Sequence, residues 1–479
     1  MQFISFNFLY FVAAVFILYN ITPDRLRWLV LLGAGYYFYG SINSQYLLFL
    51  IIPTIIVYVA GIGLEKKRKN GLILFAGILV PLGLLFTFKY LDLFFTTFAT
   101  VFSNEGIKPL DLIFPVGISF YSFRLISYIA DVYREKIVSE KHIGHFALYV
   151  SFFPQLLAGP IDRAGNIIPQ IKNRFSFDWE KFTGGLRLIL WGLFKKIVIA
   201  DRMAEFVERA YGNPADYSGI HLLLGVYFFS FQIYCDFSGY TDIAIGISKI
   251  FGFKSIENFN FPYFSRNLKD FWNRWHISLS TWLRDYIFLP VAYPVMRLFK
   301  KDKFGGVNIT SIGYVTAIFV TMFLGGLWHG ASWTFVIWGT LHGLYLVFGH
   351  MTGKLRKKFR KKIGMKKVPV LRNFLQIFIS FNLVSFAWIF FRADSFEKAI
   401  TYIKNIGFEL PDTGVPNLLY TSFFLLIFIL ADYIYKNIGK YTWIAEIPSE
   451  IKMAGYALFI VLIIIFSVDS SNEFIYFKF

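Results

Sequence analysis

The stretch FLGGLWHGASWTFVIWGTLHG at residues 323–343 places His329 and His342 in a sequence that otherwise suits a lipid environment. It lies inside a run of fifty residues, 304–353, that contains no Asp, Glu, Lys or Arg. As one helix this run would be about 75 Å long, far more than a bilayer core of about 30 Å. The run therefore predicts a break in the helix, and the glycines on both sides of Trp328-His329 favour that place.

The whole chain has the composition of an integral membrane protein. Of its 479 residues 56% are hydrophobic and 21% aromatic, and its mean hydropathy is +0.54. The long apolar segments lack the strict alternation of barrel strands, so we expect an all-α polytopic protein with about 11–13 transmembrane or re-entrant helices and some interfacial helices. The candidate spans lie near 4–20, 26–40, 46–64, 71–88, 111–130, 143–160, 183–200, 220–236, 311–328, 331–349, 374–391, 418–431 and 453–468.

The polar stretches are too short to form a soluble domain, which predicts one membrane domain over residues 1–479. We expect N-terminal spans in 1–105, a catalytic core at about 110–350 and C-terminal spans in 371–479. The net charge of +18 lies largely in basic runs beside spans, such as 354–367 with nine basic residues, which favours anionic lipid and not nucleic acid as the partner. Three spans precede the first basic run at Lys66, so the N-terminus is predicted to be outside.

His329 at the predicted break is the first candidate for chemistry. Burial keeps an imidazole neutral and able to accept a proton, which is the state that a general base requires. The alternative is a structural histidine that is hydrogen-bonded between helices. For His342, thirteen residues further and so on a different helical face, the structural alternative is favoured.

A second segment, NLKDFWNRWHISLSTWLRDYIFLP at 267–290, mixes aromatic and basic residues. It predicts an amphipathic interfacial helix with Trp272, Trp275 and Trp282 in an aromatic belt. His276 in the same segment fits an anchoring role and a functional role equally.

A third segment, FFSFQIYCDFSGYTDIAIG at 228–246, places Asp236 and Asp242 among apolar residues. Ser238 and Asp242 are four residues apart and share a helix face. These groups could orient a polar substrate or bind the second nitrogen of a histidine, but a hydrogen-bonded clamp between helices explains them equally well. The sequence has no HxxxH, HxxE or GxSxG pattern and a single cysteine, so we expect neither a metal site nor serine hydrolase chemistry.

Three of these segments together resemble the membrane-bound O-acyltransferase family: DFSGYTD at 236–242, FWNRWHISLSTWLRDY at 271–286 and GGLWHGASWTFVIWGTLHG at 325–343. The similarity is to the bacterial branch that contains the alginate and peptidoglycan O-acetylation membrane proteins. It extends over most of the chain, because further agreement is found in PVGISFYSF at 115–123, QLLAGPIDR at 155–163, ENFNFPYFSRN at 257–267 and FAWIFFRADSF at 386–396.

The resemblance implies acyl transfer from a thioester donor to a hydroxyl inside a membrane tunnel, without a bound cofactor. The WHG histidine of the family corresponds to His329, and the histidine of its RWHxSLS segment corresponds to His276. Both are expected to be catalytic. Candidates for binding the substrate or its oxyanion are Asn273, Arg274, Trp338, Asp236, Ser238, Asp242 and His342.

The same resemblance implies a setting in the bacterial cytoplasmic membrane. The donor would be acetyl-CoA or another acyl thioester, including an acyl carrier, and the acetyl group would reach a cell-surface polysaccharide such as alginate. An extracytoplasmic esterase-like partner is expected to complete the transfer. Three alternatives are D-alanyl transfer to teichoic acid, a transporter or exporter of polysaccharide, and a purely structural subunit; the FFRADSF segment favours the acetylase branch.

Overall fold

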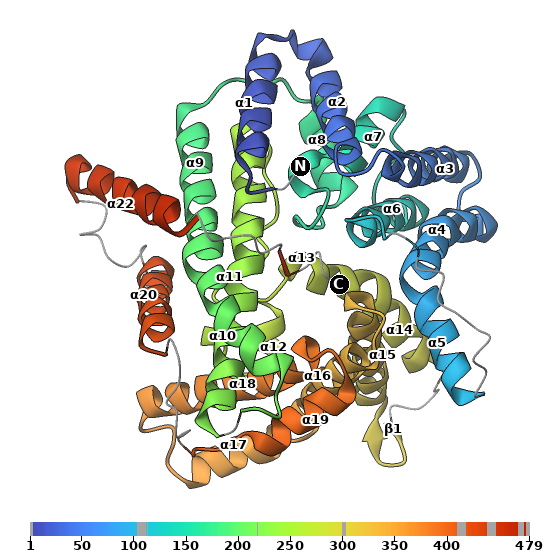
Figure 1. The fold of residues 1–479 in the computed structure, drawn as a ribbon. Helices are drawn as coiled ribbons and strands as arrows, with labels where there is room; N and C mark the ends of the chain where they lie inside the picture. Colours follow the sequence, from blue (N-terminus) through green and yellow to red (C-terminus); the bar gives the residue numbers. More distant parts are fainter. Residues whose placement is uncertain are drawn as a thin grey trace. The chain divides into compact units, whose positions relative to one another are not determined.

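The computed structural model describes residues 3–102, 112, 114–217, 219–298, 303–409, 418–437, 447–467 and 474–475, and Figure 1 shows that these are almost entirely helical. The strands within these ranges form one antiparallel hairpin, β1 (Lys303–Phe304) with β2 (Val307–Asn308). The prediction of an all-α protein is therefore confirmed.

Six helical segments of the described ranges are long and apolar enough to cross a membrane: Tyr46–Lys66, Gly71–Phe95, Ile220–Ile250, Ile309–His329, Pro369–Arg392 and Ser449–Ser467. Two shorter apolar helices, Phe6–Ile21 and Ser422–Ile434, accompany them. The chain is thus a multi-pass membrane protein. The expected number of about 11–13 helices also included shorter and re-entrant segments, and this number stays a prediction.

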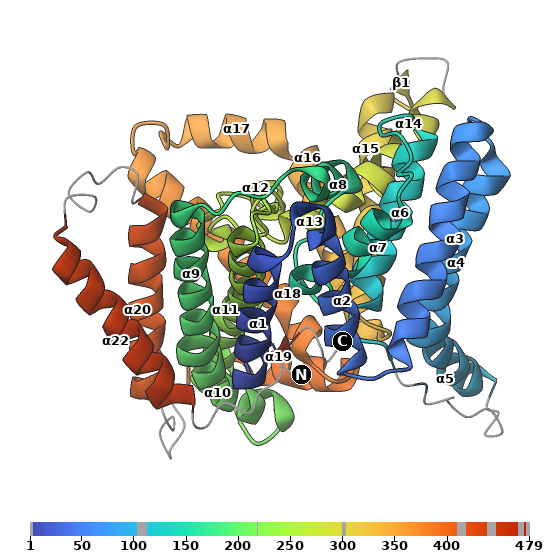
Figure 2. The same ribbon diagram turned by 90° about the horizontal axis from the view of Figure 1, so that it is seen from above.

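The chain divides into two compact units, and Met1–Gly192 with Tyr240–Glu257 forms the first. Within it, α6 is buried along almost its whole length and packs against α3 and α4, which lie side by side in Figures 1 and 2. Its helices are α1 (Phe6–Ile21), η1 (Asp24–Leu26), α2 (Arg27–Gly40), α3 (Tyr46–Lys66), α4 (Gly71–Leu85), the π-helical turn η2 (Phe86–Tyr90), α5 (Leu91–Val101), α6 (Ile118–Tyr133), α7 (Ile143–Ser151), η3 (Phe153–Gln155), α8 (Ala164–Lys172) and most of α9 (Trp179–Leu193).

One predicted span of this unit, 143–160, is wrong. The segment holds only the nine residues of α7, about 13 Å of helix, followed by a short turn and irregular backbone. The buried Arg124 makes this possible, because its guanidinium donates to the carbonyls of Gln155 (3.1 Å) and Pro160 (3.3 Å). A charged side chain here satisfies the carbonyls that a continuous helix would have bonded internally.

The second unit contains Leu193–Gly239 and Asn258–Phe479 and carries most of the residues that the sequence singled out. The long helix α11 (Ile220–Ile250) begins in this unit and ends in the first. The other helices of the second unit are η4 (Phe194–Ala200, π-helical), α10 (Asp201–Gly212), η5 (Pro262–Phe264), α12 (Leu268–Trp272), α13 (Ile277–Leu283), η6 (Arg284–Phe288, π-helical), α14 (Leu289–Arg297), α15 (Ile309–His329), α16 (Trp333–Met351), α17 (Gly353–Lys362), α18 (Pro369–Arg392), α19 (Phe396–Asn405), α20 (Leu418–Asn437) and α22 (Ser449–Ser467).

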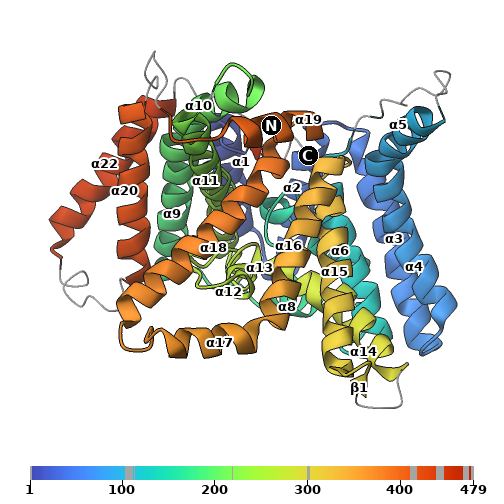
Figure 3. The same ribbon diagram turned by 90° about the horizontal axis from the view of Figure 1, so that it is seen from below.

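The basic run at 354–367 folds into the short helix α17, which lies crosswise to α16 in Figures 2 and 3. Its apolar residues Leu355, Phe359 and Ile363 are four residues apart and exposed, while the residues between them are mostly Lys and Arg. An amphipathic helix of this kind is typical of the membrane interface. This agrees with the lipid partner that the charge pattern predicts.

Helices α15 and α16 pack closely against each other, and glycines on both sides allow it (Figure 3). A Cβ atom at Gly339 would overlap the carbonyl oxygen of Met322, and one at Gly326 would overlap that of Phe335. Because neither position has room for a side chain, the two backbones are in direct contact. This contact fixes the positions of the side chains at the end of α15.

We expect Gly339→Ala to lower the free energy of unfolding by about 1–3 kcal/mol, since the helices must separate to admit the methyl group. Thermal unfolding of the purified protein in detergent measures the effect. Gly343→Ala, one turn further along α16, is the matched control, because its Cβ would lie 3.4 Å from the nearest atom, an ordinary contact. Equal melting temperatures of the two variants would contradict the prediction.

Candidate functional site

His329 is the last residue of α15, and the chain breaks immediately after it. Gly330 is extended with φ −169° and ψ 155°, and α16 begins at Trp333 after Ser332, whose hydroxyl accepts from the Thr334 N–H. The predicted break is therefore confirmed, although Gly325 and Gly326 stay helical and only Gly330 takes part in it. His342 lies on α16, so the two histidines are on two packed helices and not on different faces of one.

Five rings form a continuous buried row, which we call the His–Trp array: His276, Trp328, His329, Trp338 and His342. Neighbouring ring centroids are 5.9 Å apart for His276 and Trp328, 4.8 Å for Trp328 and His329, 4.9 Å for His329 and Trp338, and 4.9 Å for Trp338 and His342. Each side chain is at most 6% exposed. The fold thus brings together three histidines that the sequence separates by up to 66 residues.

Helix α18 covers this array with the aromatic residues of the FAWIFFRADSF segment. The ring of Phe391 lies 5.1 Å from that of His329, and Trp388 stacks on Trp338 at 5.6 Å with an interplanar angle of 19°. Both residues are 1% exposed. This aromatic wall surrounds the imidazole of His329 with apolar surface, where electrostatic interactions are stronger than in water.

His276 is held in an unusual backbone conformation. Its φ of +44° and ψ of +54° lie in the left-handed region, which a residue other than glycine seldom adopts, and α13 begins directly after it. The side-chain oxygen of Asn258 accepts from the N–H (3.2 Å) and hydroxyl (2.9 Å) of Ser278 and lies 3.0 Å from His276 Nδ1. Because this oxygen can only accept, Nδ1 carries the proton and Nε2 is the acceptor nitrogen of the ring.

Burial lowers the pKa of His276 to about 3, so the ring is neutral at physiological pH. Asn258 is itself buried and was missed as a site residue, although it stands in the segment ENFNFPYFSRN that carries the family resemblance. The available signal was an amide in an apolar segment, but its partner is eighteen residues away and only the fold identifies it.

The prediction that 267–290 is one interfacial helix with an aromatic belt is wrong. The segment forms α12, a turn that ends at His276, α13 and the π-helical turn η6. Trp272, Trp275 and Trp282 are buried, at 8%, 1% and 4% exposure. The left-handed turn at His276 breaks the helix, and Trp272 and Trp275 pack against Trp338 of α16 and Trp388 of α18.

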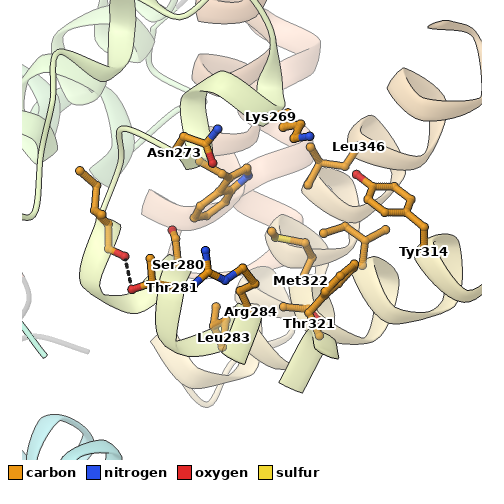
Figure 4. A pocket seen from close by; sticks show the side chains of 14 residues that line it. Lys269, Asn273, Ser280, Thr281, Leu283, Arg284, Tyr314, Thr321, Met322 and Leu346 are labelled. Carbon is orange, nitrogen blue, oxygen red and sulfur yellow. Dashed lines mark hydrogen bonds between the residues drawn. The ribbon is translucent and has the colours of Figure 1, made fainter. Parts of the chain in front are cut away.

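A cavity of about 230 Å³ lies beside these helices, between α12–α13 and α15–α16. Figure 4 shows Asn273, Ser280 and Thr281 on one side of it and Tyr314, Met322 and Leu346 on the other, and exposed Lys269 and Arg284 also line it. Trp272 lines it too and lies next to Trp338 and His342, with ring centroids 5.9 Å and 5.1 Å apart. His329 is not among the residues that line this cavity, and Trp338 touches both Trp272 and His329.

The other expected oxyanion donors lie elsewhere. Asn273 is exposed at the cavity. Arg274 binds the carboxylate of Asp270 at 2.8 Å and the carbonyl of Asn260 at 3.3 Å, which braces the turn before His276. Of the candidates named from the sequence, the array contains Trp338 and His342 beside the two expected catalytic histidines.

Asp236 and Ser238 belong to a buried ionic cluster and act as the interhelical clamp. Lys196 Nζ lies 2.6 Å from Asp236 and 2.9 Å from Asp201, and Lys195 Nζ donates to the Ser238 hydroxyl at 2.8 Å. The second oxygen of Asp236 accepts from the backbone N–H of residue 475 near the C-terminus (2.9 Å). The sequence signal for this cluster was the lysine pair inside an apolar segment, because buried lysines need acidic partners.

Asp242 lies further along α11, in the part that belongs to the first unit, and is half-buried. It is thus separated along the helix from Asp236 by a turn and a half. One alternative was that these aspartates bind the second nitrogen of a histidine. At His276 it is Asn258 that contacts Nδ1.

Comparison with known proteins gives a family and several relatives. Residues 134–393 match the model described as MBOAT, membrane-bound O-acyltransferase family. The chain is 35% identical over 407 residues to a probable alginate O-acetylase of Pseudomonas aeruginosa, which covers 83% of this chain and 73% of that protein. It is 34% identical over 408 residues to the peptidoglycan O-acetyltransferase of Helicobacter pylori, covering 79% of this chain and 73% of the relative.

A more distant relative is named for the transfer of a D-alanyl group and not of an acetyl group. The chain is 32% identical over 296 residues to the teichoic acid D-alanyltransferase of Streptococcus thermophilus, covering 58% of this chain and 68% of that protein. The relatives that match this chain are therefore named for transfer of different acyl groups, acetyl in some and D-alanyl in others.

We expect Lys196→Met to reduce the free energy of unfolding by about 3–5 kcal/mol, because it leaves two buried carboxylates without their cation. Adding Asp236→Asn to this variant should restore part of the loss. Thermal unfolding measures both, with Lys357→Met on the exposed α17 as the control. A Lys196→Met protein as stable as the wild type would refute the role of the cluster.

Proposed function

Because the chain belongs to the membrane-bound O-acyltransferase family and is an O-acyltransferase, we propose that it transfers an acetyl group from a thioester to a hydroxyl, with His329 as the general base. The final acceptor that we propose is a cell-surface polysaccharide, reached through a partner protein, since the O-acetylating relatives are named for alginate and peptidoglycan. The observation that carries the proposal is the position of His329 at the helix break, inside a wall of aromatic rings.

In this mechanism the imidazole of His329 accepts the proton of the acceptor hydroxyl while its oxygen attacks the thioester carbonyl. The carbon–oxygen bond forms, negative charge develops on the former carbonyl oxygen, and the carbon–sulfur bond then breaks. The departing thiolate takes the proton from the imidazolium, so that His329 returns to its neutral state. The aromatic wall supports this sequence, because a dry site strengthens any hydrogen bond to the developing charge.

His276 has a supporting place in the proposal. Its neutral ring lies at the other side of Trp328 from His329, and Asn258 fixes its tautomer. We assign Asn258 as the residue that positions His276 in the array. The single membrane domain, with its core at about 110–350, remains the organisation that we propose.

The donor that we propose is acetyl-CoA. The cavity beside the array has the cations Lys269 and Arg284 at its exposed side and the apolar Met322 and Leu346 deeper in, which suits a thioester with an anionic body. We place the protein in the bacterial cytoplasmic membrane with its N-terminus outside. An extracytoplasmic esterase-like partner would accept the acetyl group and complete the transfer to the polysaccharide.

D-alanyl transfer is the second candidate, because the D-alanyltransferases share the central region of the chain. Purified protein supplied with labelled acetyl-CoA or with a D-alanyl thioester of a carrier protein separates the two. Turnover of the D-alanyl donor alone would replace acetyl by D-alanyl in the proposal and leave the role of His329 intact.

We expect His329→Ala to lower the rate of thioester consumption by about 10²–10⁴-fold, the usual contribution of a general base. The assay follows labelled acetyl-CoA with protein in lipid nanodiscs. His350→Ala, an exposed histidine on α16, serves as the control and should retain the wild-type rate. If His329→Ala keeps the wild-type rate while folding normally, the catalytic assignment is wrong.

We expect Asn258→Leu to lower the rate about 10–100-fold, because a similar volume remains but the acceptor for His276 Nδ1 and Ser278 is lost. Asn258→Asp keeps an acceptor oxygen and should recover part of the rate, which a role in packing alone does not predict. Asn260→Ala, whose side chain is exposed two residues away, is the control. Equal rates for the Leu and Asp variants would argue against positioning of His276.

A further inference from the structure

Three aromatic side chains between the cavity and His329 form what we call the indole–imidazole cluster: Trp272 of α12 with Trp338 and His342 of α16. Their ring centroids are 5.9 Å apart for the two indoles, and 5.1 Å and 4.9 Å from His342 to Trp272 and Trp338. Trp338 and His342 are four residues apart and therefore lie on one face of α16.

The nitrogen atoms of this cluster are buried without hydrogen-bond partners among the residues that the structure describes. They are Nε1 of Trp272, Nε1 of Trp338, and both Nδ1 and Nε2 of His342. The side chains are 8%, 1% and 0% exposed. Buried polar atoms are nearly always paired, and leaving one unpaired costs free energy. Four such atoms on three touching side chains point to a ligand that this site binds.

Packing does not account for these side chains. Phenylalanine would fill much of the same space and make the same edge and stacking contacts without burying an N–H group. The neighbouring positions 335 and 391 do hold Phe, in contact with each other at 4.9 Å. Phenylalanine is thus used where only packing is needed, whereas the cluster holds rings with N–H groups.

The chemistry of the cluster selects the kind of ligand. Each indole can only donate, and a neutral imidazole donates once and accepts once. The cluster therefore offers three donors and only one acceptor, and this excess of donors suits a small group with an acceptor oxygen, such as a carbonyl. Its surroundings are apolar, so a hydrogen bond to such an oxygen is not weakened by competition with water.

Position identifies which carbonyl this is. Trp272 lines the cavity, and Trp338 touches His329, with ring centroids 4.9 Å apart. Ring contacts through Trp272 and Trp338 thus connect the cavity to His329. We propose that Trp272, Trp338 and His342 form the subsite that binds the carbonyl oxygen of the acyl donor, which rests on the proposed function and makes His342 and Trp272 determinants of donor recognition.

The test compares two non-reactive analogues of acetyl-CoA on the full-length protein in nanodiscs. Both carry a methylene group in place of the thioester sulfur; one keeps the acetyl carbonyl and the other has a methylene there as well. In the wild type the ketone should bind about tenfold more tightly or better, as expected for hydrogen bonds that only the ketone can accept. Titration calorimetry measures both dissociation constants.

The variants Trp338→Phe, Trp272→Phe and His342→Leu should bring the two dissociation constants towards equality. His342→Gln should keep part of the preference, because Gln retains a donor and an acceptor. Trp282→Phe, a buried tryptophan on α13 outside the cluster, should keep all of it. Should His342→Leu fail to fold, the two Trp→Phe variants carry the test, since each removes a single N–H group.

Equal affinities of the two analogues for the wild type, or no binding of either, overturn the proposal. An unchanged ketone preference in His342→Leu and both Trp→Phe variants overturns it as well. Failure of the proposed function appears separately, because the wild type would then discriminate the ketone in binding but transfer no acetyl group.

Discussion

The break between α15 and α16 is the constraint on which the site depends. The chain must turn after His329, and the backbone contact at Gly326 and Gly339 holds the two helices close enough for their ends to share side chains. Trp338 then lies against both His329 and His342. With larger residues at these glycines the helices would separate, and the histidines would lose their common neighbour.

Polar groups in this apolar interior follow two different rules. In the ionic cluster around Lys196 each cation meets an acceptor at hydrogen-bond distance, as structure buried in a membrane protein requires. In the array beside His329, polar nitrogens are present without such partners among the described residues at Trp338 and His342. The first arrangement stabilises the fold, whereas the second leaves N–H groups for the acyl donor that we propose to bind there.

Several functional features were visible in the sequence for physical reasons. A run of fifty uncharged residues cannot be one membrane helix, so a break near His329 was predictable, and histidine is unusual in such a place. By contrast, the tryptophans of 267–290 were expected at the interface. Periodicity does not predict the left-handed turn at His276, which ends the helix, and the three tryptophans are buried.

The sequence by itself determined the helical membrane class and the family, because each depends on composition or on short local patterns. The same patterns predicted His329 and His276 as the catalytic histidines. The tertiary structure decided which side chains contact these residues. Asn258 forms a hydrogen bond with His276, Lys196 forms an ion pair with Asp236, and the ring of Trp272 packs on that of His342. The residues of each pair are far apart along the chain, and no local sequence pattern encodes their contact. Which polar groups are satisfied inside the protein and which are left for a ligand is a property of packing, and packing is set only when distant helices meet.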